Sequence, residues 1–302
     1  MLQTGSKRIK CILALFCMLM LFNACTNTQA QEYSQTPATC MSTRPLPAGE
    51  LLHLPVLMYH HLAEEAHNPW TVTPQAFAVQ MRALQEAGFT AITMQQLLEF
   101  VDYGAPLPPY PVLITFDDGY LSVYQYAFPI LEQYGHVAVS FIIGHAVGTS
   151  TYKDTGHPTT PKFDFQQARN MAGIVDIQSH SYDMHQWAPF EEGRARENIL
   201  MWYDECPHEY EQILRGDHLS ISNLVYNNLG HIPIAIAYPH GIYDQRAQDI
   251  LTSMGVRISF STREGVALIE QGNPQTLLAI PRFNIDNYVT ASSLMQLLGT
   301  IK

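Results

Sequence analysis

The chain has 302 residues, of which 47% are hydrophobic and 14% charged, so it can bury a large core and is not a disordered protein. Its 27 acidic residues outnumber 16 basic ones, the formal net charge is −11, and no basic stripe is present, which argues against nucleic acid as a partner. The length beyond the N-terminal region fits one α/β barrel of about 250 residues better than two small domains.

The N-terminus has the pattern of an export signal. Three basic residues precede an apolar run at 11–22, which suits a signal peptide but is shorter than the about 20 residues that span a bilayer. The run leads into Leu-Phe-Asn-Ala-Cys at 21–25, which is similar to a bacterial lipobox. We therefore expect a lipoprotein signal peptide at 1–24 and a lipid anchor on Cys25, with plain secretion as the alternative. In both cases the mature protein is expected outside the cytoplasm.

The next segment, 25–53, is polar and rich in Thr, Gln and Pro, which predicts a flexible tether ahead of a folded domain at 54–302. Two cysteines, Cys40 and Cys206, lie outside the signal and the lipidation motif. A disulfide between them is not favoured, because Cys40 lies in the expected tether. No CxxC pattern is present, so any metal would need His and Asp ligands.

From residue 54 onward, short apolar runs alternate with amphipathic segments, which predicts a parallel α/β barrel. The runs are apolar on both faces, as in strands that are covered on both sides. They are Val56–Tyr59, Val112–Phe116, Val137–Ile143, Ile174–Ile177, Ile234–Ala237 and Val256–Phe260.

The expected helices have readable ends. One begins at Thr73-Pro74 and stops at Gly88, and it presents Phe77, Met81 and Leu84 on one face. Another is capped by Asp244 and ended by Gly255, and a third runs from Ser122 to Gly135 with a bend or restart at Pro129. The stretches 144–172 and 186–230 are expected to be loops or short helices near the strand ends.

Asp117 and Asp118 follow the apolar run at 112–116, at the end of a barrel strand where active sites collect. Adjacent carboxylates raise each other's pKa unless a cation is near. One Asp could therefore bind a metal while the other acts as a base. A solvated pair of loop carboxylates is the alternative for this motif alone.

His180 and His185 follow another apolar run, Ile174–Ile177, within the next eight residues. On a helix they would lie about 140° apart, but at a strand end that runs into a loop both rings can converge on one cation. Neutral imidazole is the commonest metal ligand, and two His with one Asp leave positions open, as in catalytic sites. Two loop histidines with hydrogen-bonded rings are the alternative.

A third motif, Tyr238-Pro239-His240-Gly241, follows the run at 234–237. Its Pro and Gly predict a tight turn whose backbone N–H groups could face a developing oxyanion. An ordinary strand-to-helix turn is the alternative.

Together, four segments resemble the polysaccharide deacetylase family, the NodB-homology carbohydrate esterases. They are VLMYHH at 56–61, TFDDGY at 115–120, VDIQSHSYDMH at 175–185 and AYPHG at 237–241. The resemblance covers about residues 54–290 and points to the branch that acts on poly-N-acetylglucosamine and related cell-envelope glycans. It implies a distorted (β/α)7 barrel of NodB-homology type. It also implies a hydrolase that releases acetate from N-acetylglucosamine residues of an extracellular or cell-wall polysaccharide.

The resemblance implies roles for individual residues. Asp118, His180 and His185 would bind the metal, usually Zn²⁺ in this family. Asp117 would be the general base, and the backbone N–H of His240 would help to hold the oxyanion. Further substrate contacts would come from His60, Tyr238, Pro239 and Gly241.

The sequence departs from the family pattern at two places. Tyr238 stands where many relatives carry an Arg, and we expect Arg282 to orient Asp117 instead, with a surface ion pair as the alternative. A late Leu-x-His, which supplies the general acid in many relatives, is absent after residue 240. The acid is therefore unassigned among His60, His61 and His240. For the large aromatic residues Tyr59, Trp70, Trp187 and Trp202, core packing is favoured over stacking on sugar rings.

Three other functions stay open at this stage. The same fold could carry an esterase that removes O-acetyl groups from xylan or another glycan. It could also be a non-catalytic glycan-binding lipoprotein, or a metal-dependent amidase acting on a peptide or small amide. We expect a monomer that binds an acetylated glycan and meets the membrane only through the N-terminal lipid.

Overall fold

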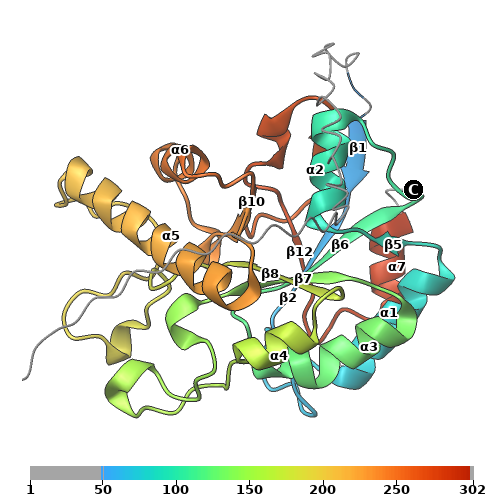
Figure 1. The fold of residues 1–302 in the computed structure, drawn as a ribbon. Helices are drawn as coiled ribbons and strands as arrows, with labels where there is room; N and C mark the ends of the chain where they lie inside the picture. Colours follow the sequence, from blue (N-terminus) through green and yellow to red (C-terminus); the bar gives the residue numbers. More distant parts are fainter. Residues whose placement is uncertain (1–48, 50, 300–302) are drawn as a thin grey trace, which may run out of the picture. The chain divides into compact units, whose positions relative to one another are not determined.

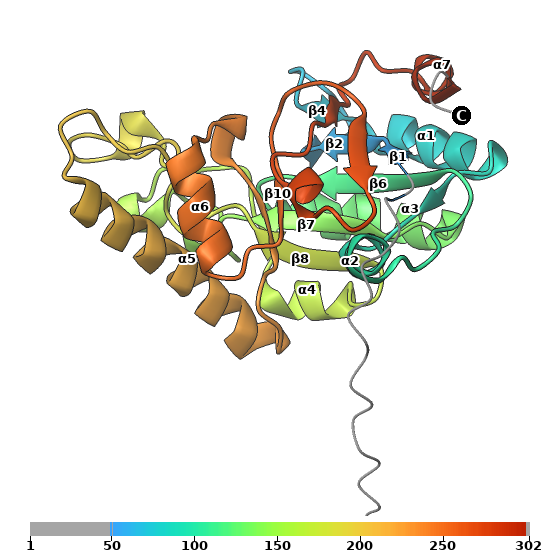
Figure 2. The ribbon, with the colours of Figure 1, turned by 90° about the horizontal axis from the view of Figure 1, so that it is seen from above.

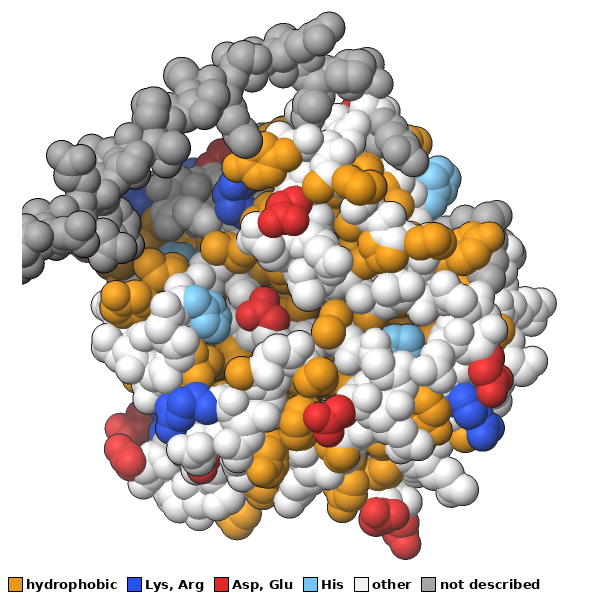
Figure 3. Space-filling view, turned by 45° about the vertical axis from the view of Figure 1, so that its right-hand side comes forward, with side chains coloured by type: hydrophobic (Ala, Val, Ile, Leu, Met, Phe, Trp, Pro, Cys, Tyr) orange, Lys and Arg blue, Asp and Glu red, His pale blue; other side chains and the backbone are white. Residues whose placement is uncertain are grey.

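The structure is a computed structural model that describes residue 49 and residues 51–299. The expected signal peptide at 1–24 and most of the expected tether lie outside the described residues. Within the described part, no helix combines the length and the apolar character needed to cross a bilayer. On the face shown in Figure 3, the visible Lys and Arg side chains of the described residues lie apart from one another and form no stripe.

A parallel sheet forms the centre of the domain (Figure 1). Its strands follow the order β10 (Ile258–Phe260), β9 (Ala235–Ala237), β8 (Val175–Ser179), β7 (Ala138–Ile142), β6 (Pro111–Phe116), β2 (Val56–Tyr59) and β12 (Phe283–Asn284), and β5 (Thr90–Ala91) also pairs with β6. Ile280, just before β12, forms a parallel bridge with Phe260 of β10. The sheet therefore curls back on itself, which confirms the expected distorted barrel.

The strands form where the sequence is apolar on both faces. All residues of β2 and β7 are buried, as are the last five of β6. Helices cover the outside, and α1 (Pro74–Glu86) packs against α3 (Phe128–Tyr134) and α7 (Ala291–Gly299). The predicted apolar face of α1, which consists of Phe77, Met81 and Leu84, is fully buried. Hydrophobic burial is therefore what fixes the helices on the sheet.

The predicted helix ends are also present. Thr73 Oγ1 accepts a hydrogen bond from the Ala76 N–H at 3.2 Å at the start of α1, and Asp244 caps α6 (Gln245–Ser253) in the same way. Before α3, a π-helical turn at Val123–Ala127 precedes Pro129, which lies in the first turn of α3. Proline suits that position because it has no N–H to donate.

Two stretches differ from expectation. Residues 51–53, in the stretch expected to be a tether, belong to β1 (Leu51–Leu54), which pairs antiparallel with β11 (Ala267–Glu270). The stretch 186–230, expected to hold loops or short helices, contains the 23-residue helix α5 (Pro207–Leu229), which packs on α6 (Figure 2). The buried face of α5 includes His218 and Ser222, and these polar residues weaken its apolar periodicity.

The remaining elements are short. A helix with a capping box at Thr93 and Gln96, α2 (Met94–Tyr103), was not predicted. The others are β3 (His61–Leu62), which pairs with β4 (Thr71–Val72), the helix α4 (Phe165–Asn170), and the 3-10 turns Gly144–Ala146, Lys153–Thr155, Ala188–Phe190, Pro239–Gly241 and Pro274–Leu277.

Candidate metal centre and active site

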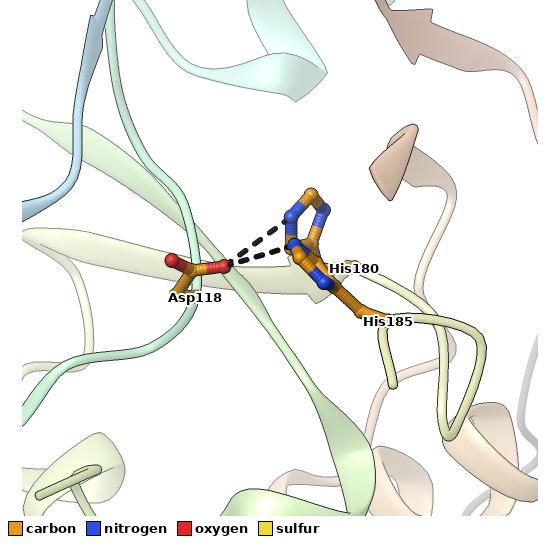
Figure 4. Close-up of side chains that lie close together, drawn as sticks. All are labelled: Asp118, His180 and His185. Atoms are coloured by element: carbon orange, nitrogen blue, oxygen red, sulfur yellow. Dashed lines mark ion pairs between the residues drawn. The ribbon is translucent and has the colours of Figure 1, made fainter. Parts of the chain in front are cut away.

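Three candidate ligands converge at the carboxyl ends of two strands. Asp118 follows β6, and His180 follows β8 and leads into the loop that carries His185. Figure 4 shows both imidazole rings near one oxygen of Asp118. The distances from Asp118 Oδ1 are 3.4 Å to His180 Nε2 and 3.7 Å to His185 Nε2, and one ligand atom of each residue lies within 4.8 Å of the others.

A hydrogen bond fixes the orientation of the His180 ring. His180 Nδ1 lies 2.7 Å from the carbonyl oxygen of Ala237, at the end of β9. A carbonyl oxygen can only accept, so Nδ1 carries a proton, and Nε2 is the nitrogen that the neutral ring can offer to a metal. Such a bond behind a metal-ligating histidine sets the tautomer and the direction of the ring.

The charges of these residues suit a divalent cation. Burial raises the pKa of Asp118, but Lys162, His180 and His185 outweigh it and hold the pKa well below its usual range. Burial lowers the pKa of His185 to about 3, so its ring is neutral at physiological pH. An ionised carboxylate with imidazole nitrogens is a donor set that Zn²⁺ accepts. The three residues therefore fit a divalent metal ion.

The backbone at the site lies in conformations that are rare outside glycine. Asp118, Ser181 and His240 have φ values of +70°, +72° and +56°. Each such residue costs on the order of 1–3 kcal/mol, and such residues cluster at functional sites. All three lie in the turns that follow β6, β8 and β9, so the strain is located where the candidate site is formed.

Arg282 forms a buried ion pair with Asp117. Its side chain is fully buried, and its two terminal nitrogens donate to the two carboxylate oxygens of Asp117 at 2.7 Å each. Arg282 Nε also donates to the carbonyl of Ser261 at 3.0 Å. Burial raises the pKa of Asp117, but Arg282 and His180 outweigh it, so that the pKa lies below its usual value. The structure therefore places Arg282 in a buried two-point contact with Asp117, rather than in a surface ion pair.

Of the two neighbouring histidines near β2, only His60 lies at the site. Burial lowers the pKa of His60, and its surroundings include the charges of Asp117 and Asp118. Its ring centroid is 5.1 Å from that of Trp70, whose side chain is 52% exposed. His61 Nδ1 instead lies 2.9 Å from the hydroxyl of Ser122, which also accepts a hydrogen bond from the Leu62 N–H.

The turn after β9 differs in part from expectation. Tyr238 was expected to contact substrate, but its side chain is buried and stacks on Tyr243 with ring centroids 4.8 Å apart. Pro239 is buried as well, whereas His240 is exposed, and its ring centroid lies 4.4 Å from that of His185. The side chain of Tyr238 therefore belongs to the packing against α6, and the backbone of the turn stays the candidate for contact with the reacting group.

Gly241 is constrained by packing. A Cβ on this residue would lie 2.1 Å from Thr262 Oγ1, and its φ is +69°. We predict that Gly241→Ala lowers the free energy of unfolding by about 1–3 kcal/mol. Gly216→Ala is the matched control, because Gly216 lies inside α5 with open space around it, and alanine there should add about 0.5–1 kcal/mol. Denaturant unfolding of both variants measures this difference, and equal stabilities would contradict the prediction.

A cleft of about 810 Å³ opens beside the candidate ligands. Its lining includes Asp118, Tyr120, Tyr152, Lys162, His185, Trp187, Glu197 and His240.

The Trp187 side chain is 51% exposed, so the expectation of core packing is wrong for Trp187 and for Trp70. It holds for Tyr59, which is buried. Trp202 lies under the guanidinium groups of Arg194 and Arg196.

Two residues of the cleft were not found from the sequence. The Nζ of Lys162 lies 3.4 Å from the ring centroid of Tyr120. Burial lowers the pKa of Lys162 to about 8, against the charge of Asp118, and burial together with Asp118 raises the pKa of Tyr120. Tyr120 lies within the TFDDGY segment, but Lys162 is distant in sequence from every motif.

A second hollow, of about 600 Å³, lies at the amino-terminal ends of β7 and β8, away from the candidate ligands.

The known proteins to which the chain is similar are named as deacetylases. The sequence model of the polysaccharide deacetylase family matches residues 104–259. A poly-beta-1,6-N-acetyl-D-glucosamine N-deacetylase of Escherichia coli is 25% identical over 324 residues, which cover 100% of this chain and 46% of that protein. The chain thus spans about half the length of this relative.

Two solved structures share the fold. The IcaB structure from Ammonifex degensii is 24% identical and has a TM-score of 0.65, with 82% of this chain and 97% of that chain covered. A de-N-acetylase from Aggregatibacter actinomycetemcomitans is 21% identical and has a TM-score of 0.68, with 82% and 99% covered.

Proposed function

The chain belongs to the polysaccharide deacetylase family, and from this premise we propose that it is a metal-dependent hydrolase that removes N-acetyl groups from N-acetylglucosamine residues of an extracellular or cell-wall polysaccharide. The observation that carries the proposal is the convergence of Asp118, His180 and His185 beside the ion-paired Asp117. The name of the E. coli relative supports poly-β-1,6-N-acetylglucosamine as the polymer.

The residues divide into metal ligands and groups that act on the substrate. Asp118, His180 and His185 would hold the cation, for which we propose Zn²⁺. When bound, such a cation polarises a carbonyl group and lowers the pKa of water. Asp117 takes a proton from the attacking water, since Arg282 keeps its carboxylate ionised. The backbone N–H of His240 donates to the oxyanion that forms on the acetamide oxygen.

The leaving amine needs a proton before acetate is released. His61 contacts Ser122 instead, so we do not propose it for this role. The charges of Asp117 and Asp118 act on His60, and the ring of His240 lies beside that of His185. We propose that one of these two histidines protonates the amine.

Trp187 supports a polymeric substrate rather than a small amide. Its half-exposed ring lines the cleft on the same loop as His185, and flat aromatic faces are suited to packing against sugar rings. We predict that Trp187→Ala raises KM for an oligomer of five or more sugars by about tenfold, corresponding to ~1.4 kcal/mol of binding, and leaves KM for a disaccharide nearly unchanged. Trp202→Ala, outside the cleft lining, is the control. Equal changes in KM for long and short substrates would contradict the prediction.

For the location of the protein, we propose that the mature chain lies outside the cytoplasm, attached through a lipid on Cys25 or secreted. The proposal rests on the apolar run at 11–22 and the motif at 21–25. Incorporation of labelled palmitate into the wild-type chain and its loss in Cys25→Ser tests the lipid. Retention of the label in Cys25→Ser would contradict it.

A substrate panel tests the proposed reaction. Acetate release is measured with β-1,6-linked N-acetylglucosamine oligomers, chitooligosaccharides, acetylated xylan and acetylated peptides. The proposal predicts release from the N-acetylated sugars. Release from xylan alone would identify an O-acetyl esterase, and release from peptides alone an amidase. Binding of the glycans without release from any substrate would indicate a binding protein.

A further inference from the structure

The six-residue stretch from His180 to His185 forms no regular helix or strand. It turns sharply at Ser181, whose φ is +72°, and the Ser181 hydroxyl accepts a hydrogen bond from the Met184 N–H at 3.1 Å. Since the two histidines are candidate ligands of one ion, the shape of this loop sets the separation of their rings. What holds the loop therefore also sets the geometry of the metal centre.

On one side the loop is fixed by a carboxylate from a distant helix. Asp217, in the middle of α5, accepts the backbone N–H of Tyr182 through Oδ2 at 2.9 Å and that of Asp183 through Oδ1 at 2.7 Å. Both oxygens are used, one for each of two consecutive peptide groups.

On its other side the loop is fixed by the turn after β7. The Gly144 N–H donates to the carbonyl of Ser181, and the His145 N–H donates to that of Tyr182, both at 3.0 Å. His145 Nδ1 also lies 3.1 Å from the Tyr182 carbonyl. Lys153 Nζ lies 2.9 Å from Asp183 Oδ1. The loop is thus held between α5 and the segment after β7, and Asp217 supplies the hydrogen bonds from α5.

We propose that Asp217 is a positioning residue for the metal centre, because its carboxylate fixes the peptide groups that lead from His180 to His185 and so places the His185 ring toward Asp118. The inference rests on the proposed function, since it assigns Asp217 a role in the same site. Both of these hydrogen bonds come from backbone N–H groups and not from a candidate ligand side chain, so Asp217 acts through the backbone.

The test is the zinc affinity of Asp217→Asn in the purified full chain, measured by competition with a chromophoric chelator and by the visible spectrum of bound Co²⁺. Asparagine keeps the size of the side chain but replaces one acceptor oxygen by an NH₂ group that cannot accept. We expect the zinc dissociation constant to rise about 10–100-fold, as for other groups that orient metal ligands, with an altered Co²⁺ spectrum. Asp249→Asn, the same change at an exposed position of α6, should leave both readouts unchanged.

A second background separates positioning from a general effect on the fold. In His185→Ala, the further change Asp217→Asn should not weaken zinc binding again, since the ligand that it places is gone. A full second loss of affinity, or unchanged affinity of Asp217→Asn with His185 present, would overturn the inference. Absence of zinc binding in the wild type would instead contradict the proposed function, and the inference with it.

Hydrogen exchange in the wild-type chain tests the contact without any substitution. The amides of Tyr182 and Asp183 should exchange slowly, since both donate to Asp217. Exchange at the rate of exposed amides would overturn the inference even if Asp217→Asn failed to fold.

Discussion

Replacement of Asp117 by asparagine should reduce the rate of acetate release by about 10²–10⁴-fold, which is the usual contribution of a general base. Asp117 is the carboxylate that Arg282 keeps ionised next to the candidate ligands. Asparagine has nearly the same shape but cannot take a proton. The rate constant is measured with saturating oligomer and saturating zinc, so that neither substrate nor metal limits the reaction.

The control for this variant is its affinity for zinc. The candidate ligands Asp118, His180 and His185 are unchanged, so Asp117→Asn should bind zinc within a few-fold of the wild type. Asp118→Asn should instead lose both zinc affinity and activity. If Asp117→Asn retained more than a tenth of the wild-type rate, Asp117 would not be the base.

Replacement of Arg282 by methionine should lower the free energy of unfolding by about 3–5 kcal/mol, because it leaves a buried carboxylate without its partner. Arg282 is fully buried and Asp117 is 2% exposed. Arg194→Met is the matched control, since Arg194 forms an exposed ion pair with Asp204, and exposed pairs contribute only about 0–1 kcal/mol. Similar losses in the two variants would contradict the account of the buried pair.

Arg282→Met should also change how the rate of acetate release depends on pH. The pKa of Asp117 in the folded wild type lies below its usual value of 3.8. The pair therefore stabilises the fold fully above pH 3.8 and loses this contribution as the pH falls through the lower, folded pKa. Without Arg282, burial raises the pKa of Asp117, so the acid limb of the rate profile should move to higher pH. If the acid limb of Arg282→Met stayed at the wild-type pH, a group other than Asp117 would determine the position of that limb.

The barrel could be predicted because its strands are buried on both faces. The runs that become β2, β6 and β7 consist almost entirely of apolar residues, and this pattern is independent of their partners. Helix α1 could be predicted because Thr73 and Pro74 mark its start locally. Helix α5 could not, because its buried face includes the polar residues His218 and Ser222. In addition, the partner of its Asp217 is the loop at 182–183, which comes from elsewhere in the chain.

The same distinction applies to the site. Asp117, Asp118 and His180 each follow an apolar strand, so sequence position alone indicates that they share one end of the barrel. The contact of Arg282 with Asp117 was expected only because Tyr238 stands where relatives carry an Arg. Lys162 and Asp217 have no local signal, since their roles depend on contacts made by folding. The roles of the individual site residues and the export of the chain stay predictions.

The most direct test of the central claim is acetate release from β-1,6-linked N-acetylglucosamine oligomers by chelator-treated protein, before and after titration with Zn²⁺. The account predicts no release from the metal-free protein and recovery that saturates at one zinc per chain, since the three converging ligands form one site. Undiminished release from protein shown to be free of metal, or no release at any zinc concentration although one ion is bound per chain, would contradict it.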